Sequence, residues 1–215
     1  MAGEDRLMPG IAVGQPAPSF RLPLAQGAEI GLEDFRGKKN VVVWFTKGMA
    51  CPFCRAQMSQ LSRAYGDLQK LDAEILEVSG SAVSRAQVYA KKFKLPFPYL
   101  CDPDYRVRRQ WGLGRREHGL GHYVRGFVHG ATAEKPPNDF GDFFPPLDEM
   151  RNLLNDDDMG FFIVDKQGVV RYALAGSYIH GAKDRQLPSN EEILREIVKC
   201  EAPGSDAPDT HTGAS

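Results

Sequence analysis

The stretch NVVVWFTKGMACPFCRAQMSQL, residues 40 to 61, decides the fold and raises the question of function. Its first six residues, 40–45, are mostly β-branched or aromatic and do not alternate with polar residues, which predicts a central strand covered on both faces. After Pro52 the apolar residues recur at spacings of three and four, which predicts a helix about five turns long. These residues are Met58, Leu61, Tyr65, Leu68 and Leu71. Cys51 and Cys54 therefore lie where a buried strand ends and a helix begins.

The flanking sequence alternates between predicted strands and helices. EILEVSG (74–80) and FPYLCD (97–102) are predicted strands, and FFIVD (161–165) and VVRYALAG (169–176) form a predicted hairpin around a Lys-Gln-Gly turn. The predicted helices are a short LEDF segment, 81–95 opened by Ser81, 105–111, and 189–199 capped by Ser189 or Asn190. Strand-helix alternation followed by a hairpin predicts an α/β sandwich with a mixed sheet.

Composition divides the chain into one domain with loose ends. Residues 1–12 are expected to be a flexible N-terminus, residues 13–200 a single domain, and residues 201–215 a disordered tail. Residues 112–158, rich in Gly, Pro and aromatics, exceed an ordinary connection and are interpreted as an insertion with a functional or partner-binding role. The insertion's histidines and acidic run are interpreted as surface loop residues, and no metal site is predicted. They are His118, His122, His129 and Asp156 to Asp158.

Charge and hydropathy exclude several classes of function. The chain has 27 Lys and Arg against 28 Asp and Glu, a net charge of -1, so it offers no broad basic surface for nucleic acid. No apolar run approaches the roughly 20 residues that cross a membrane, and the N-terminal residues lack the apolar region of a secretory signal. The expected location is therefore the cytoplasm. No glycine-rich phosphate loop is present, so no cofactor is expected.

The predicted helix start gives the cysteine pair its chemistry. Free backbone N–H groups and the positive end of the helix dipole favour a thiolate there and lower a cysteine pKa. Pro52 suits the first helical turn, and Lys47 and Arg55 can add positive charge. On these grounds Cys51, the outer residue, is the predicted nucleophile and Cys54 the thiol that resolves it.

Three simpler interpretations of the pair remain open. A zinc site needs two further ligands, whereas Cys101 and Cys200 are isolated in the sequence. A structural disulfide and two inert core thiols are the other interpretations, and the strand-to-helix junction argues against both. Cys101 is interpreted as a buried small hydrophobe, Cys200 as a minor thiol, and Trp44 and Trp111 as core residues.

Several stretches resemble the peroxiredoxins, the alkyl hydroperoxide reductase and thiol-specific antioxidant branch of the thioredoxin-fold superfamily. They are VGQPAPSFRLP, IGLEDFRGKKNVVVWF, CPFC, FPYLCDPDYRVRRQWGL and FFIVDKQGVVRY, which cover Val13 to about Gly112 and Phe161 to about Gly176. The resemblance implies a thioredoxin-like three-layer sandwich with a central mixed β-sheet flanked by helices. It also implies antioxidant, hydroperoxide-reducing activity, an external dithiol reductant such as a thioredoxin-like protein, and a homodimer.

The same resemblance assigns the cysteines differently. Cys54 takes the peroxidatic position, Cys51 replaces the family's threonine, and Lys47 replaces its proline. Met159 stands where peroxiredoxins often have a peroxide-orienting arginine and thioredoxins a proline. The candidate residues for stabilising the thiolate or lining its pocket are Thr46, Lys47, Pro52, Arg55, Met159 and Arg171, although a strand-face role is favoured for Arg171.

Three functions follow as hypotheses. The first is a thiol peroxidase in which Cys51 and Cys54 cycle between dithiol and disulfide. The second is a protein thiol-disulfide reductase with the same fold, whose substrate is a disulfide. The third is a non-enzymatic redox sensor or binding module that uses the 112–158 insertion.

Overall fold

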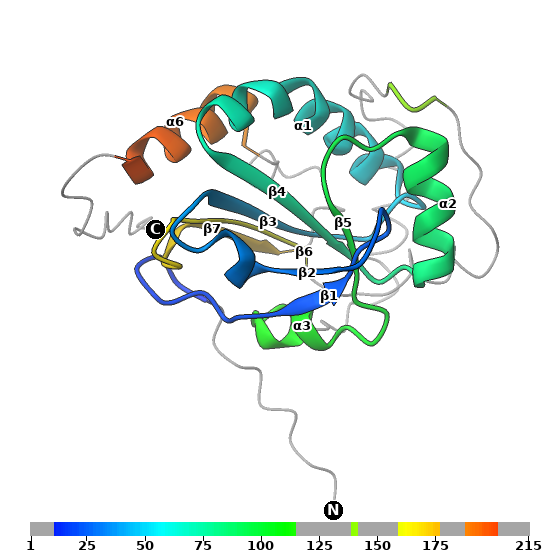
Figure 1. Cartoon of the computed structure of the whole chain (residues 1–215), viewed down its shortest axis with the longest axis horizontal. Coiled ribbons are helices and arrows are strands. Elements are labelled where there is room, and N and C mark those ends of the chain that lie inside the picture. Colours follow the sequence, from blue (N-terminus) through cyan, green and yellow to red (C-terminus); the bar gives the residue numbers. More distant parts are fainter. Residues whose placement is uncertain (1–10, 115–138, 142–158, 177–187, 202–215) are drawn as a thin grey trace, which may run out of the picture.

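The computed structural model describes residues 11–114, 139–141, 159–176 and 188–201 (Figure 1). Residues 1–10, most of the expected insertion and the segment 202–215 lie outside the described residues, together with the three insertion histidines and the acidic run. Glu201, which was expected to begin the tail, instead ends the last helix and accepts a hydrogen bond from the Asn40 side chain at 2.6 Å.

A five-stranded mixed sheet organises the described residues, with strand order β5-β4-β3-β6-β7. Strands β3 (Asn40–Thr46), β4 (Ala73–Ser79) and β5 (Tyr99–Cys101) are parallel. Strand β6 (Met159–Val164) runs antiparallel to β3, and β7 (Val170–Gly176) forms the predicted hairpin with it. The parallel half arises because helices connect its strands, whereas a short turn forces the last pair to be antiparallel.

The central strand β3 is buried along its whole length, as its apolar sequence predicts. Alternate side chains of a strand point to opposite faces, so Val42 and Trp44 belong to one apolar core and Val41, Val43 and Phe45 to the other. The cysteine pair belongs to the first of these cores, which we call the helix-side core.

Helices and a small sheet cover the two faces (Figure 1). Helices α1 (Pro52–Lys70), α2 (Val83–Phe93) and α6 (Asn190–Glu201) pack over the helix-side core. The other face carries α3 (Arg106–Gln110), the 3-10 helix Leu32–Phe35, and the two-stranded sheet of β1 (Arg21–Pro23) and β2 (Glu29–Gly31). This arrangement is the three-layer α/β sandwich that the sequence predicted.

The helix caps confirm one sequence-based prediction and contradict another. Ser189 caps α6 as predicted, because its Oγ accepts from the Glu192 N–H at 3.2 Å while the Glu192 carboxylate accepts from the Ser189 N–H at 2.7 Å. The prediction that Ser81 opens α2 was wrong, because the N-cap of this helix is Ala82. The Ser81 hydroxyl is instead drawn into the core, where it lies 3.2 Å from the Tyr99 hydroxyl.

The connection from β3 to α1 makes a tight turn at Gly48. This glycine has φ +74°, and a Cβ built on it would lie 2.7 Å from the Tyr99 hydroxyl and 3.1 Å from the Ser79 and Ser81 hydroxyls. A left-handed backbone and a buried polar cluster therefore both require glycine at this position. The turn sets where the next residues, including Cys51, are presented.

We predict that Gly48→Ala lowers the free energy of unfolding by about 1–3 kcal/mol through backbone strain and overpacking. Gly66→Ala is the matched control, because Gly66 lies within α1 and has nothing within 4 Å of its missing Cβ. It should raise the free energy of unfolding by about 0.5–1 kcal/mol. Urea denaturation of both variants measures the difference, and equal stability of the two would contradict the role given to Gly48.

Candidate active site

Cys51 is the N-cap residue of α1. Its backbone is extended, with φ -82° and ψ 118°, and its Sγ accepts a hydrogen bond from the Cys54 N–H at 3.3 Å. Its carbonyl accepts the first helical hydrogen bond, from the Arg55 N–H at 3.1 Å. Pro52 occupies the first helical position, as predicted, where its missing N–H costs nothing. A sulfur therefore takes the place that a Ser or Asp oxygen usually fills at a helix start.

The two sulfurs differ in burial. Cys51 keeps 7% of its surface exposed, whereas Cys54, on the first turn of α1, keeps none. Both are free thiols in the structure. The two thiols belong to the same buried cluster, and the Cys54 N–H donates to the Cys51 Sγ, so the two residues are already in contact before any reaction. This geometry agrees with the prediction that Cys51 is the outer sulfur.

Hydrogen bonds lower the pKa of Cys51 to about 7 from an ordinary 9.0. The Cys54 side chain makes the largest contribution, and the Cys54 backbone N–H, the positive charge of Lys47 and the Phe53 backbone N–H act in the same direction. Burial opposes them by disfavouring the charge. The Cys51 thiolate is therefore well populated near neutral pH.

Burial is the largest effect on Cys54 and raises its pKa well above the ordinary value. The neighbouring Cys51 and the carboxyl of Glu77 raise this pKa further, while the Lys47 backbone N–H lowers it. The Cys54 Sγ also lies 3.9 Å from the Met159 Sδ. Cys54 therefore stays protonated, as a thiol held against Cys51.

Two buried arginines fix the loop that carries Cys51. Arg55, expected to supply charge to the thiolate, donates to the carbonyls of Met49 at 2.5 Å and Ala50 at 3.3 Å. Arg108 of α3 donates to the Thr46 carbonyl at 2.5 Å from the other face. The sequence analysis did not single out Arg108, which lies among alternating apolar and basic residues that suggest an ordinary surface helix.

Thr46 connects the loop to a carboxyl that the sequence analysis missed. Its hydroxyl donates to Glu77 Oε1 at 2.9 Å and accepts from the Gly48 N–H at 2.9 Å. Glu77 lies in β4 and is fully buried. The signal in the sequence was an acidic residue inside an apolar strand, EILEVS. The Thr46 hydroxyl is therefore hydrogen-bonded to both the loop and Glu77, and Thr46 and Glu77 both belong to the site.

Met159 and Arg171, both pocket candidates, lie at opposite ends of the β6-β7 hairpin. Met159 pairs with Gly176 across the hairpin and reaches Cys54. Arg171 lies five residues before Gly176, about 17 Å along an extended strand, and pairs with Asp165 at 2.6 Å. Arg171 was therefore wrong as a pocket candidate, and the favoured strand-face interpretation describes its position.

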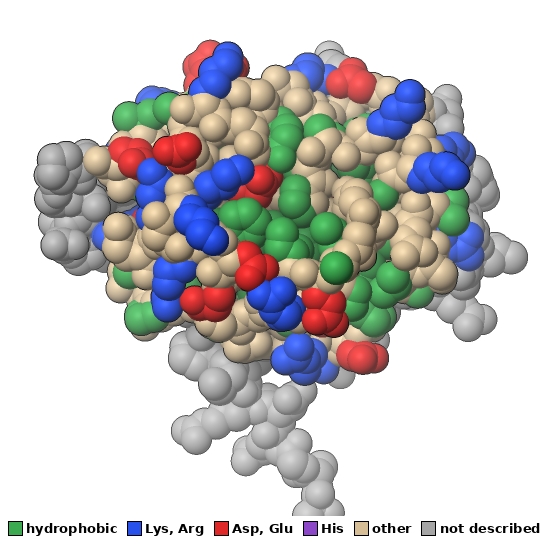
Figure 2. Space-filling model, in the orientation of Figure 1, with side chains coloured by type: hydrophobic (Ala, Val, Ile, Leu, Met, Phe, Trp, Pro, Cys, Tyr) green, Lys and Arg blue, Asp and Glu red, His purple; other side chains and the backbone are tan. Residues whose placement is uncertain are grey.

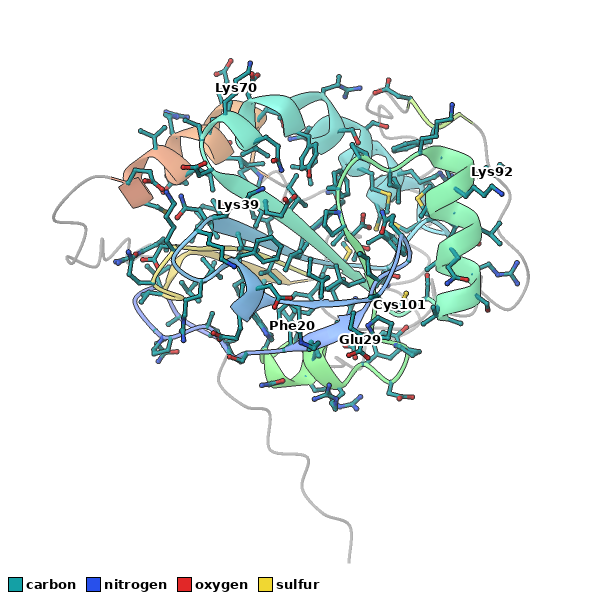
Figure 3. All side chains as sticks on the ribbon, in the orientation of Figure 1. Phe20, Glu29, Lys39, Lys70, Lys92 and Cys101 are labelled. Atoms are coloured by element: carbon teal, nitrogen blue, oxygen red, sulfur yellow. The ribbon has the colours of Figure 1, made fainter. Side chains whose placement is uncertain are left out.

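The other two cysteines lie on β5 and α6. Cys101 is fully buried at the end of β5, on the side where α2 packs (Figure 3), and burial raises its pKa to about 11. Cys200 lies near the end of α6, where its Sγ donates to the Glu196 carbonyl and burial raises its pKa to about 11. Its thiol is influenced by Asp165 and Arg171, which places it at the end of the sheet away from Cys51.

The described residues show neither a metal-binding cluster nor a membrane-spanning helix. They hold no group of three or more His, Cys, Asp and Glu side chains placed to share a metal ion. None of the helices in this part of the chain combines the length and apolarity needed to cross a bilayer. On the face shown in Figure 2, acidic and basic side chains are interspersed around a central apolar area.

The chain resembles known proteins over its described fold. It is 36% identical over 100 residues to the chloroplastic peroxiredoxin Q of Populus jackii, a match that covers 46% of this chain and 46% of the relative. The chain spans about half the length of the curated relatives that it matches at this level.

Solved structures show the same fold at low sequence identity. PrxQ of Xylella fastidiosa, in a mutant form, superimposes with a TM-score of 0.62 at 13% identity and covers 89% of this chain and 98% of its own. Peroxidoxin BcpB of Mycobacterium tuberculosis gives a TM-score of 0.59 at 15% identity, over 88% and 98%. The AhpC/TSA family model matches residues 13–173, which is more than half of the chain. On this match, together with the thioredoxin-like sandwich, the chain belongs to the AhpC/TSA family of peroxiredoxin-like proteins.

Proposed function

We propose that this protein is a thiol peroxidase that reduces hydroperoxides through a Cys51/Cys54 dithiol-disulfide cycle. One observation carries the proposal: the Cys51 Sγ caps a helix by accepting from the Cys54 N–H, and the Cys54 thiol lies in the same buried cluster. The cap stabilises a nucleophilic thiolate, and the neighbouring thiol supplies its resolving partner. Membership of the AhpC/TSA family supports peroxide as the oxidant.

The chemistry requires two steps. In the first, the Cys51 thiolate attacks one peroxide oxygen, the O–O bond breaks, and the leaving oxygen takes a proton to give an alcohol or water. Cys51 is then a sulfenic acid. In the second, Cys54 attacks the Cys51 sulfur, the S–S bond forms, the S–O bond breaks, and water leaves. An external dithiol returns the pair to its reduced form by thiol-disulfide exchange.

Exposure and charge support Cys51 as the nucleophile. A peroxide must reach the attacking sulfur, and Cys51 keeps 7% of its surface exposed whereas Cys54 keeps none. Nucleophilic attack also needs the thiolate, and the pKa of Cys51 is lowered while that of Cys54 is raised. The family resemblance favours Cys54, so the two assignments make different predictions.

The proposal extends to partners and location. A thioredoxin-like dithiol protein is the reductant that suits a disulfide at a helix start, and a homodimer is the assembly that the resemblance suggests. Because both thiols of the pair are reduced in the working state, the protein suits a compartment that keeps thiols reduced, which supports the cytoplasm.

The Cys51 thiolate predicts a specific pH profile. Alkylation of Cys51 should rise with pH around a midpoint of about 7, because its pKa is lowered to about 7 from 9.0. Cys54→Ala should move the midpoint toward 9.0, because it removes the largest stabilising contact. Cys54→Ser is the matched control: its hydroxyl can still donate, so its midpoint should stay lower. Mass-spectrometric rates of iodoacetamide labelling give the midpoints, and identical shifts in both variants would refute the hydrogen bond's role.

Single-cysteine variants separate the two assignments of the nucleophile. Cys51→Ser should lower peroxide turnover by more than about 10³-fold, the scale for losing a nucleophile. Cys54→Ser should instead consume one equivalent of hydrogen peroxide and stop with a sulfenic acid at Cys51. Stopped-flow fluorescence and dimedone labelling measure both. Full turnover in Cys51→Ser would show that Cys54 is the attacking thiol.

The same preparations separate the other hypotheses. A protein disulfide reductase would reduce insulin at the expense of an external dithiol while reacting with peroxide no faster than free cysteine. A redox sensor or binding module would do neither and would retain a partner through residues 112–158, most of which lie outside the described structure.

A further inference from the structure

Glu77 is a buried carboxyl on the cysteine face of the sheet. It lies opposite Trp44 in the β3-β4 register, and its strand neighbours Leu76 and Val78 point to the other core. By alternation the Glu77 side chain points into the helix-side core, which contains Cys51 and Cys54. Its Oε1 accepts from Thr46, whereas Oε2 is buried and has no hydrogen-bond partner among the described residues.

The hydrogen bond from Thr46 engages only one oxygen of this carboxyl. Glu74, three residues earlier in β4, is also buried, but it forms an ion pair with Lys39 and accepts hydrogen bonds from Tyr65 and Gln69. Glu77 has one hydrogen bond and one unpartnered oxygen. A buried carboxylate with an open oxygen is costly, and a protonated carboxyl placed there can exchange its proton.

The groups that face Glu77 are the two reacting thiols, a threonine hydroxyl and a phenol. They are Cys51 from the loop, Cys54 from α1, Thr46 from β3 and Tyr99 from β5. Burial, and to a smaller extent the Cys51 charge, raise the pKa of Glu77 to about 8, while the hydrogen bond from Thr46 opposes them. The Tyr99 hydroxyl is engaged by Ser79 and Ser81, and its pKa is also raised.

We propose that Glu77 is the proton-exchange residue of the cysteine pair, accepting the Cys54 proton as the disulfide forms and returning it on reduction. The proposal rests on the thiol-peroxidase function above, and it assigns Glu77 a role through Cys54, without contact to the peroxide.

The proton movements balance over the two steps. In the reduced state Cys51 is the anion, and Glu77 and Cys54 hold protons. When Cys51 becomes a neutral sulfenic acid, its repulsion of the Glu77 charge disappears, so Glu77 can then release its proton to solvent, while the leaving oxygen of the peroxide has taken its own proton from solvent. As Cys54 attacks Cys51, the Cys54 proton passes to the Glu77 carboxylate, and the departing hydroxide takes up a proton to become water. The cycle consumes one proton and one peroxide for each disulfide formed.

Single-turnover kinetics of Glu77→Gln test the assignment. Sulfenic acid formation at Cys51 should keep the wild-type rate, because the amide keeps the shape and a hydrogen bond to Thr46. Condensation with Cys54 should slow by about 10²-fold, the low end of general-base effects. The wild-type rise of condensation rate with pH, with a midpoint below about 8 once the Cys51 charge is gone, should disappear. A merely structural role would not remove this pH profile.

Glu74→Gln is the matched control on the same strand. It should lose stability, because it breaks the Lys39 pair and the Tyr65 contact, yet keep the wild-type condensation rate and pH profile. Condensation in Glu77→Gln at the wild-type rate and with the wild-type pH profile would overturn the proposal.

Infrared titration of the wild-type protein gives a second test that does not depend on folding of a variant. The buried carboxyl should show a lower apparent pKa in the disulfide form than in the dithiol form, because the Cys51 charge has gone. The disulfide form can be made with an exchange oxidant such as oxidised dithiothreitol, so this test stands even if peroxide fails to oxidise Cys51. Absence of peroxide oxidation would refute the thiol-peroxidase function, and the same carboxyl pKa in both forms would refute the role of Glu77.

Discussion

The site depends on one hydrogen-bonding arrangement at the start of α1, which satisfies both the helix end and the Cys51 thiolate. The first turn of a helix leaves N–H groups without acceptors, and a thiolate at near-neutral pH needs donors to persist in a water-poor site. The Cys54 N–H meets both requirements by donating to the Cys51 sulfur, and the Cys54 thiol also lowers the pKa of Cys51. The same contact therefore caps the helix, ionises the outer thiol and holds the second thiol within reach of the first.

The position of the Cys51 sulfur is fixed by buried side chains that hold the preceding loop, and not by the helix alone. Arg108, fully inside the protein, donates to the Thr46 carbonyl at the end of β3, and its own N–H is held by the Asp102 carboxylate at 2.9 Å. Gly48 turns the chain over the Tyr99 hydroxyl, and Arg55 holds the two carbonyls that follow. Buried arginine and tyrosine side chains therefore hold this loop, which has no regular secondary structure, in the conformation that presents the Cys51 sulfur.

Periodicity predicted the elements because each one buries a continuous apolar surface. The run 40–45 could only be a strand covered on both sides, and the apolar spacing after Pro52 could only be a helix packed along one face. The contacts of polar side chains were less predictable, because they depend on residues distant in sequence. Arg55 was expected beside the thiolate but donates to a carbonyl of the loop. Ser81 was expected to cap α2, but its hydroxyl lies against that of Tyr99. Glu77 hydrogen-bonds to Thr46, which is 31 positions away in the sequence.

A closed, apolar pocket with three acidic groups can hold only a limited charge. The Cys51 charge raises the cost of ionising Cys54 and Glu77, and Glu77 raises that of Cys54, because burial leaves these charges poorly screened. Their protonation states therefore belong to the set rather than to any one residue. In the dithiol state the charge rests on Cys51, because the Cys54 N–H donates to that sulfur and the positive charge of Lys47 favours its ionisation. Oxidation of Cys51 removes the group that carries the negative charge, so Cys54 and Glu77 must redistribute their protons. Because that redistribution follows from burial itself, a redox change at one sulfur alters the acidity of a carboxyl on the adjoining strand without any movement of the backbone.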